Sequence, residues 1–421
     1  MKIKVVEFFS GIGSQAKALS RISRKRKIEI DVLKTCEWNI HAFVAYNLIH
    51  SSKLIPKNIL HMTKEELVDE LDSLAISYNG KNSISRRQLL SLNDDLLKLI
   101  YHSIINNNNL VNIEKVKGVD LPNDIDLLTY SFPCQDLSNV GSFHGYKHGI
   151  DRDKNTRSGL LWEVERILEE KKRENDKLPK FLLLENVTAL VAQRHNVNFE
   201  EWKMKLELLG YKNRVYTLNA QDFGIPQYRK RIIMLSILVG NDSALGDKIE
   251  KYLNQHNLND INYLKSLKIP KRELKNFLRL NYEEKNLYKE ALEAQPNLTK
   301  SRLKIWDSNS KIVDEQKNIA EKVQTITTKQ DRHPNSGNIF FNPDNDKSKF
   351  RFLTPRECFL LMGFDEKDYD KLLINNIITR RNSLLFTRDI LYKLAGNSIV
   401  VDILEHVFDQ LIDIKQIYID K

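Results

Sequence analysis

The chain has 421 residues with 66 lysines and arginines against 56 acidic residues, a formal net charge of +10. No apolar run reaches the ~18 residues that a membrane span needs, and no signal peptide precedes the first predicted strand. The three cysteines form no CxxC pair, which argues against a structural zinc site and fits a reducing cytosol. The positive charge favours a polyanionic partner, with nucleic acid first, although a generally lysine-rich composition would give the same balance.

The N-terminal segment predicts a strand over residues 3–9 and then a glycine-rich turn into a helix. Gly11, Gly13 and Ala16 have the G-x-G-x-x-A spacing of a dinucleotide-binding turn. Glycines there let the backbone approach a ligand at the N-terminus of a helix. NAD enzymes and S-adenosylmethionine enzymes both use such turns, so this motif alone does not choose between them.

A second strand is predicted over residues 28–36, and it ends at Glu37 and Trp38. An acid about 20 residues past the glycines is placed to accept hydrogen bonds from ribose hydroxyls, and Trp38 could lie against an adenine ring. Residues 41–110 are polar and mostly helical in pattern, which indicates an insertion on an α/β core.

The apolar run 125–130 predicts a buried strand that stops at Pro133, because proline cannot donate to a sheet ladder. Cys134 follows, where a parallel sheet opens into its ligand crevice. A lone cysteine is usually a small buried apolar residue, yet this position suits a nucleophile. The glycine-rich segment 139–149 has the composition of a mobile lid.

Another buried strand, 180–184, ends in a carboxylate, Glu185. Farther along, Gln227, Arg229 and Arg231 lead into a strand over 232–238. Arg229 and Arg231 share one strand face because side chains alternate, and two guanidiniums there suit a phosphate or a polarised carbonyl.

From residue 241 to 345 the chain is polar and rich in lysine and asparagine, which predicts a separate binding domain. A helix is predicted over 351–364, entered through Thr354 and Pro355 with the proline in its first turn, and with Cys358 packed on its apolar face. Residues 393–399 are expected to form a loop, followed by an amphipathic helix to about residue 412.

Together these motifs resemble the DNA cytosine-5 methyltransferases in identity and order. The family's F-x-G-x-G, E-W, P-C-Q, E-N-V, Q-x-R-x-R and G-N-S motifs correspond to Phe9-Gly11-Gly13, Glu37-Trp38, Pro133-Cys134-Gln135, Glu185-Asn186-Val187, Gln227-Arg229-Arg231 and Gly396-Asn397-Ser398. The matches cover roughly residues 1–240 and 350–421, and the catalytic part looks similar to the mollicute CpG enzymes. The resemblance implies an α/β fold: a Rossmann-like S-adenosylmethionine-dependent methyltransferase domain with a smaller, irregular target-recognition domain.

The resemblance also implies catalytic roles for Cys134, Glu185, Gln227, Arg229 and Arg231. The thiolate of Cys134 would attack carbon 6 of a flipped cytosine, while Glu185 holds and protonates its N3 side. Arg229 would brace the O2 carbonyl or the region of Cys134. The segment 139–149 would close over the flipped base.

S-adenosylmethionine is the implied cofactor. The residues implied to contact it are Phe9, Gly11, Ile12, Gly13, Glu37, Trp38, Asn112, Ile113, Pro133, Leu160, Asn397 and Ser398. One departure stands at Val111-Asn112-Ile113, where the family usually has Gly-Asp-Ile. The Asn112 carbonyl can accept the adenine amino hydrogen bond without the charge of an aspartate.

Double-stranded DNA is the implied partner, contacted through Ser138, Thr327, Thr328 and Arg332. The recognition segment departs from the CpG enzymes, so their specificity does not carry over. We expect a monomer without a metal in the bacterial cytoplasm, associated with the nucleoid. It would act in restriction-modification, beside a separate cognate endonuclease, or as an orphan or phage enzyme.

The expected domains are a catalytic domain (1–240), a target-recognition domain (241–390) and a C-terminal segment (391–421) that returns to the catalytic domain. Three other interpretations stay open. A tRNA cytosine-5 methyltransferase would share the catalytic motifs, a non-catalytic DNA-binding paralogue would share the fold, and a nicotinamide dehydrogenase would share only the glycine turn.

Overall fold

The computed structural model describes residues 1–133, 150, 158–174, 177–332, 335–379 and 383–420. The chain forms two compact units. The first unit consists of Met1–Leu218, Lys230–Leu267 and Leu404–Lys421, and the second consists of Asn219–Arg229 and Lys268–Ile403. None of the described helices is long and apolar enough to cross a bilayer.

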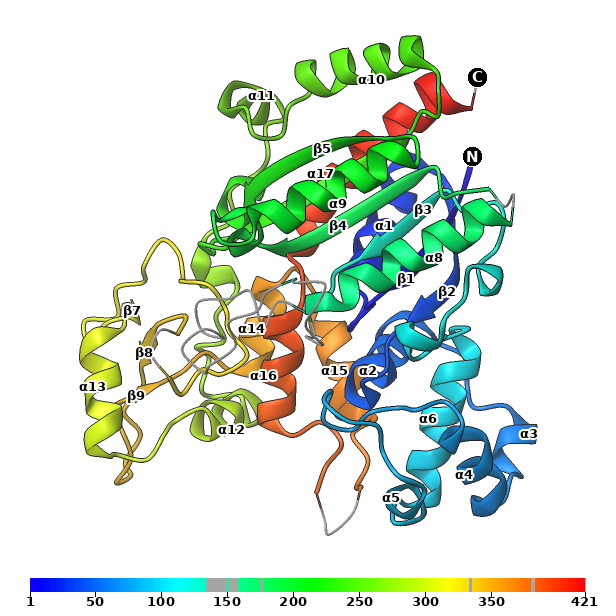
Figure 1. The fold of residues 1–421 in the computed structure, drawn as a ribbon. Coiled ribbons are helices and arrows are strands. Elements are labelled where there is room, and N and C mark those ends of the chain that lie inside the picture. The colour runs from blue at the N-terminus through cyan, green and yellow to red at the C-terminus, as the bar shows by residue number, and fades with distance from the viewer. Residues whose placement is uncertain (134–149, 151–157, 175–176, 333–334, 380–382, 421) are drawn as a thin grey trace. The chain divides into compact units, whose positions relative to one another are not determined.

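A six-stranded sheet forms the centre of the first unit (Figure 1). Its strands, in spatial order, are β2 (Glu29–Cys36), β1 (Lys2–Phe8), β3 (Leu127–Tyr130), β4 (Phe181–Val187), β6 (Lys230–Leu238) and β5 (Tyr211–Asn219). The pairs from β2 to β4 are parallel, whereas β6 runs antiparallel to β4. Every strand predicted from an apolar run is present, and the predicted α/β fold class is confirmed.

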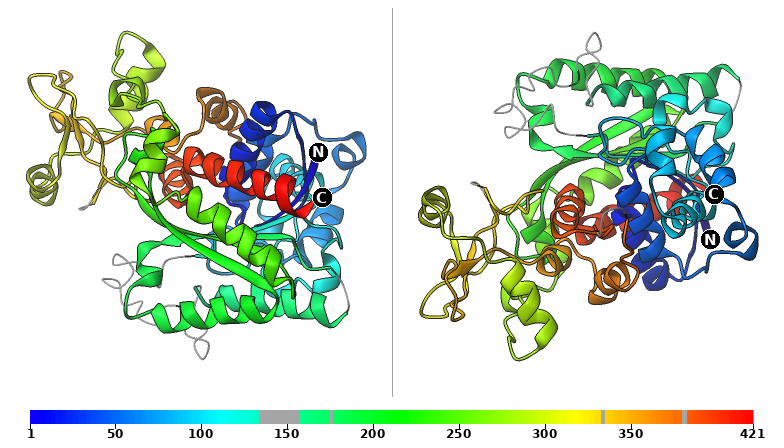
Figure 2. Two further views of the ribbon diagram at one scale, coloured as in Figure 1. Left: turned by 90° about the horizontal axis from the view of Figure 1, so that it is seen from above. Right: turned by 90° about the horizontal axis from the view of Figure 1, so that it is seen from below.

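Helices cover both faces of this sheet (Figures 1 and 2). On one face lie α8 (Leu161–Arg173) and α9 (Asn196–Leu208), and on the other lie α1 (Ser14–Arg26) and α17 (Val401–Ile414). The inner strands β3 and β4 are buried over almost their whole length because both faces are covered, which is the usual pattern of a parallel sheet, whereas the edge strands β2 and β5 are only partly buried.

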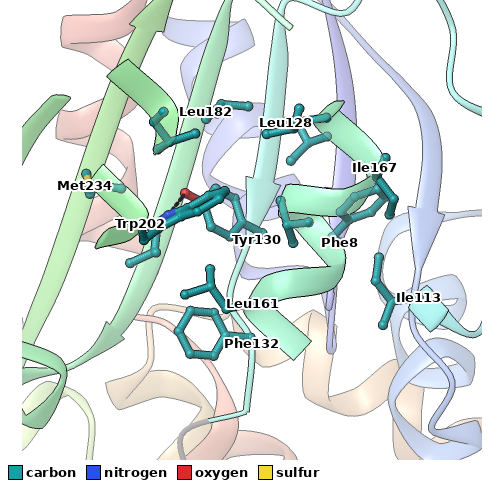
Figure 3. Close-up of a cluster of buried hydrophobic side chains, with 14 of the residues drawn as sticks. Phe8, Ile113, Leu128, Tyr130, Phe132, Leu161, Ile167, Leu182, Trp202 and Met234 are labelled. Carbon is teal, nitrogen blue, oxygen red and sulfur yellow. Dashed lines mark hydrogen bonds between the residues drawn. The ribbon is translucent and has the colours of Figure 1, made fainter. Parts of the chain in front are cut away.

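The core under α8 and α9 is a continuous cluster of buried side chains (Figure 3). Tyr130 of β3 and Trp202 of α9 meet edge to face, and the indole Nε1 donates to the Tyr130 hydroxyl at 3.0 Å. Phe132 extends the cluster beyond the end of β3 and is 2% exposed. The core therefore fixes the chain up to the residue before Pro133.

The predicted helical insertion is present and belongs to the first unit. Its helices are α2 (Ile40–His50), α3 (Lys57–Leu60), α4 (Lys64–Asp72), α5 (Arg86–Leu90) and α6 (Asp94–Asn106). A capping box at Thr63 begins α4, and Asn93 caps α6.

The C-terminal helix α17 is attached to the first unit by ion pairs with α1 and by a contact with α10 (Ser243–Gln255). Arg21 bonds Glu405 at 2.8 Å, Arg26 pairs with Asp409, and Tyr252 of α10 donates to Asp413 at 3.0 Å. Helices α10 and α11 (Ile261–Ser266) thus lie in the first unit although the sequence places residues 241–267 in the recognition domain. The buried face of α10 outweighs the polar composition of that segment.

The second unit contains the helices α12 (Lys285–Glu293), α13 (Lys300–Ser308), α14 (Pro355–Leu361), α15 (Glu366–Ile374) and α16 (Arg388–Asn397), with a small sheet of β7 (Lys311–Val313), β8 (Asn338–Phe340) and β9 (Phe350–Arg351). Two expectations are wrong here. The predicted helix 351–364 is entered through Thr354 and Pro355 as expected, but it is shorter than predicted, because it ends at Leu361 and Arg351 belongs to β9. The predicted loop at 393–397 is the last turn of α16, whose buried face includes Leu394 and Ala395.

Candidate active site

The glycine turn connects β1 to α1 at the end of the sheet. Gly11 and Gly13 have φ angles of +55° and +81°, in the left-handed region that favours glycine. A Cβ on Gly13 would lie 2.3 Å from Nε2 of His50, so no larger residue fits without displacing that ring. Beside Gly11 nothing lies within 4 Å of such a Cβ. The turn therefore packs on α2 at Gly13 and leaves space at Gly11.

Phe9 begins this turn with a φ of +55°, which is unusual for a residue with a side chain. It is half-buried, whereas Ile12 is 3% exposed. Leu160 also packs against the core cluster, at the start of α8. All three predicted cofactor residues lie in the first unit.

Glu37 stands directly beside the turn. Because Phe8 of β1 pairs with Cys36 of β2, the two strands end together and Glu37 follows at once. One Glu37 oxygen accepts from the Gly11 backbone N–H at 3.2 Å, and the other accepts from the Asn39 N–H at 2.8 Å. The carboxylate is half-buried, as is the neighbouring Trp38. This arrangement suits a nucleoside with ribose hydroxyls near Glu37.

Asn112 and Ile113 lie near the end of β2 in space, although they are far from it in sequence. Val111 has a φ of +62°, a conformation that is costly for a β-branched residue and that the family's usual glycine would adopt freely. Asn112 Oδ1 already accepts from the Glu114 N–H at 3.1 Å, which caps a short 3-10 helix. An adenine amino group would have to share that oxygen. Ile113 is 4% exposed and belongs to the core.

A buried carboxylate that sequence reasoning missed, Glu7, lies on β1 just before the turn. It is 0% exposed, and the hydroxyl of Tyr46 on α2 donates to it at 2.7 Å. Burial raises the pKa of Glu7 to about 7, while the Tyr46 hydrogen bond opposes this rise. The sequence signal that could have identified Glu7 is an acidic residue inside an apolar strand, just before a glycine turn.

Glu7→Gln is expected to make the protein more stable than wild type above neutral pH. The raised pKa means that the native state keeps its proton longer than the unfolded chain, so wild-type stability falls as pH rises from about 4.5 through about 7. Relative to the variant, this loss amounts to about 2–3 kcal/mol between about pH 5 and pH 8. Urea unfolding of both proteins at several pH values tests it, and parallel pH profiles would contradict the assignment.

The tips of β3 and β4 form a second part of the site. Tyr130 pairs with Leu184, so the chain beyond β3 runs beside Glu185 and Asn186. Asn186 Nδ2 donates to the Phe132 carbonyl at 3.1 Å and is 2% exposed. This bond fixes the chain immediately before half-buried Pro133. Asn186, which the sequence offered only as part of a motif, is therefore a structural support of the site.

The predicted nucleophile Cys134, the predicted DNA contact Ser138 and the predicted lid 139–149 lie outside the described residues. The other two cysteines, Cys36 and Cys358, are buried, as the sequence predicted for Cys358, and burial raises the pKa of each thiol. Among the described residues no group of His, Cys, Asp and Glu side chains is arranged to hold a metal ion.

Glu185 is 8% exposed at the end of β4, and its acidic group lies beside Arg231. Arg231 Nε is 3.3 Å from Glu185 Oε1, with side-chain exposures of 14% and 10%. The antiparallel pairing of Val187 with Arg231 brings the two together. A nearly buried carboxyl group paired with a guanidinium at the crevice end of a sheet can bind a polar heterocycle edge and exchange a proton with it.

The remaining predicted residues lie in the second unit. Gln227 and Arg229 are 0% and 2% exposed, and their side chains bind backbone groups of that unit. Asn397 is exposed and Ser398 is buried at the end of α16. Thr327 and Thr328 are half-exposed and Arg332 is exposed, in a segment without helix or strand.

Comparison with known proteins places this geometry among methyltransferases. Residues 85–413 match the family model described as C-5 cytosine-specific DNA methylase. The orphan methyltransferase M.SssI of Spiroplasma monobiae is 34% identical over 428 residues, 97% of each chain. The type II methyltransferase M2.ScrFI of Lactococcus lactis subsp. cremoris is 33% identical over 411 residues, covering 97% of this chain and 99% of its own.

Among solved structures, the Dnmt2 methyltransferase of S. pombe has the same fold, with a TM-score of 0.56 at 17% identity over 98% of both chains. The Entamoeba histolytica methyltransferase EhMeth is similar, with a TM-score of 0.52 at 14% identity, again over 98% of both chains. The predicted resemblance in sequence and in fold is confirmed.

Proposed function

Since the chain belongs to the C-5 cytosine-specific DNA methylase family, we propose that it methylates carbon 5 of a flipped cytosine in a short duplex DNA sequence. The observation that carries the proposal is the Glu185–Arg231 pair at the end of β4, beside the chain that leads into Pro133 and Cys134. Methylation of a cytosine ring needs a nucleophile at carbon 6, which Cys134 would supply, and polar partners at N3 and O2, which the Glu185–Arg231 pair would supply.

The methyl donor in this proposal is S-adenosylmethionine, which supplies an electrophilic methyl group. The first unit offers it a fitting cradle: space beside Gly11 and the half-buried carboxylate of Glu37 at the adjoining strand end. Phe9, Ile12, Gly13, Trp38, Ile113, Pro133 and Leu160 would complete this side. Asn112 would receive the adenine amino group, and Asn397 and Ser398 enter through the family resemblance alone.

Cys134 would activate the ring. Its thiolate forms a bond to carbon 6, and the displaced electron pair makes carbon 5 nucleophilic enough to accept the methyl group. The methyl donor would leave as S-adenosylhomocysteine, N3 would return its proton to Glu185, and carbon 5 would lose its proton to water as the Cys134–carbon 6 bond breaks, which restores the ring and the thiolate. Full ionisation of an ordinary thiol gains only about 30-fold at neutral pH, so other groups must supply most of the acceleration.

Glu185 would supply part of that acceleration by binding and protonating N3 of the cytosine. General acid catalysis of this kind contributes about 10²- to 10⁴-fold. The geometry favours Arg231, rather than Arg229, as the donor to the O2 carbonyl, because Arg231 lies 3.3 Å from Glu185 while the Arg229 guanidinium binds backbone carbonyls of the second unit.

The DNA would be contacted by Ser138, Thr327, Thr328 and Arg332. A few side chains reading base edges in the major groove would give a short recognition sequence. We place the protein in the bacterial cytoplasm, on the nucleoid, as a monomer. It would act either beside a separate restriction endonuclease or as an orphan methyltransferase.

Base-resolution 5-methylcytosine sequencing of plasmid DNA from cells that express the chain tests the proposal. We expect methylation confined to one short sequence, and none above background with Cys134→Ala, because the variant cannot form the bond to carbon 6. Methylation by Cys134→Ala at the wild-type level would refute the mechanism. No methylation by the wild type would refute the DNA substrate, and tRNA would then be assayed.

A further inference from the structure

Two buried side chains of the second unit, Gln227 and Arg229, hold the peptide unit around Ile326 from both sides. The Gln227 Oε1 accepts from the Ile326 N–H at 3.0 Å, and Arg229 Nη1 donates to the Ile326 carbonyl at 2.7 Å. Gln227 is itself fixed, because its Nε2 donates to the Leu361 carbonyl at 2.9 Å. Ile326 directly precedes Thr327 and Thr328, so this bonding sets the start of the predicted DNA-contacting segment.

The other terminal nitrogen of the same guanidinium binds the end of α16. Arg229 Nη2 donates to the carbonyls of Gly396 and Ser398 at 3.0 and 2.8 Å. These two residues flank Asn397 in the motif that the family uses for the cofactor. One planar guanidinium therefore connects segment 326–328 to segment 396–398, and a lysine ammonium could not reach both in this fork geometry.

The two segments also touch directly. A Cβ on Gly396 would lie 2.5 Å from the backbone carbon of Thr327 and 2.5 Å from the backbone nitrogen of Thr328. Close backbone packing leaves little room for one segment to move while the other stays. The guanidinium and the glycine thus restrain the same pair of segments.

We propose that Arg229 is a positioning residue that couples DNA binding to cofactor binding. This rests on the proposed function, which gives Thr327 and Thr328 to the DNA and Asn397 and Ser398 to the cofactor. A ligand that orders one segment also orders the other through Arg229, so the second ligand binds a site that is already arranged. Such coupling is reciprocal: DNA strengthens cofactor binding by the same factor by which the cofactor strengthens DNA binding.

The coupling is measured as a ratio of dissociation constants. S-adenosylhomocysteine is titrated into the full-length protein alone and in the presence of a duplex that carries the sequence methylated in the plasmid experiment. We expect the duplex to strengthen binding by about 5- to 150-fold in the wild type. In Arg229→Lys this factor should fall by about threefold or more, since lysine retains the charge but holds only one segment, while the Gly396 contact still restrains the pair in part.

Arg272→Lys is the matched control in the same unit. The Arg272 guanidinium also binds a backbone carbonyl, that of Gly224 at 3.2 Å, and pairs with Asp402, but it touches neither segment. This variant should keep the wild-type factor. If Arg229→Lys fails to fold, Gln227→Met removes the second bond to Ile326 and is expected to lower the factor in the same direction.

Three outcomes would overturn the inference while leaving methylation intact. The first is a wild-type ratio of dissociation constants near unity, and the second is an unchanged ratio in Arg229→Lys. The third is weaker binding of each ligand by Arg229→Lys with the wild-type ratio retained. The last result would mean that Arg229 only supports the fold. Failure of wild-type S-adenosylhomocysteine binding, or absence of 5-methylcytosine in the plasmid, would instead overturn the proposed function and the inference with it.

Discussion

Glu185→Gln is expected to lower kcat by about 10²- to 10⁴-fold while leaving DNA affinity and cofactor affinity close to those of the wild type. Glutamine preserves the size of the side chain and can still accept from Arg231, so the packing at the end of β4 should survive. What it loses is the ability to give and take a proton at N3 of the cytosine. Single-turnover methylation of a duplex, with binding measured separately, resolves the two effects.

Glu165→Gln serves as the control for this prediction. Glu165 of α8 is also a buried carboxylate, 4% exposed, and it lies 3.4 Å from the Lys205 ammonium. The same chemical change away from the strand tips should leave kcat within a few-fold of wild type. A Glu185→Gln enzyme that turned over like Glu165→Gln would remove Glu185 from the proposed mechanism.

The strand ends of the site could be predicted from sequence because neighbouring residues in the chain determine each of them. An apolar run marks each of β1, β2, β3 and β4; a glycine or proline follows β1 and β3, and an acidic residue stands at the end of β2 and β4, and parallel strands bring such ends to one edge. Glu37 therefore lies next to the glycine turn, and Glu185 lies beside the chain that leaves β3, as the pattern required.

The different surroundings of Arg229 and Arg231 could not be predicted in the same way. Strand alternation says that the two share a face, but not which groups oppose them. Arg231 belongs to β6, whose pairing with β4 brings it to Glu185, whereas Arg229 precedes the strand and binds Ile326 and α16. Those partners lie about a hundred residues or more away in sequence, so only the tertiary fold determines them.

The predicted helix boundaries are wrong where burial of apolar side chains outweighs a local sequence signal. Gly396 and Asn397 suggested a loop, yet α16 continues through them after its start at the Thr387 cap, because Leu394 and Ala395 are buried. Similarly, α10 is polar in composition, but its buried Ile249 and Leu253 attach it to the first unit. Burial of a few apolar side chains outweighs composition in both cases.

A fully buried ion pair in the second unit provides the largest expected effect on stability. Arg351 of β9 and Glu357 of α14 are both 0% exposed and are joined by two parallel contacts of 2.8 Å. Glu357 also accepts from the backbone N–H groups of Thr354 and Arg279, at 2.7 and 2.8 Å. Burial lowers the pKa of Arg351, but the Glu357 carboxylate raises it above its usual value, so the guanidinium stays charged in the core.

Glu357→Gln should therefore destabilise the second unit by about 3–5 kcal/mol, because it leaves the Arg351 charge buried without a counter-charge. Glu273→Gln is the control: Glu273 is 67% exposed where it pairs with Lys275 in the same unit, and loss of such a surface pair costs about 0–1 kcal/mol. Hydrogen exchange follows the second unit separately from the first, which has its own core. Equally small effects of both substitutions would show that water reaches Arg351. A selective loss of hydrogen-exchange protection around β9 and α14 would instead show that the ion pair stabilises this unit, which also contains segments 326–328 and 396–398.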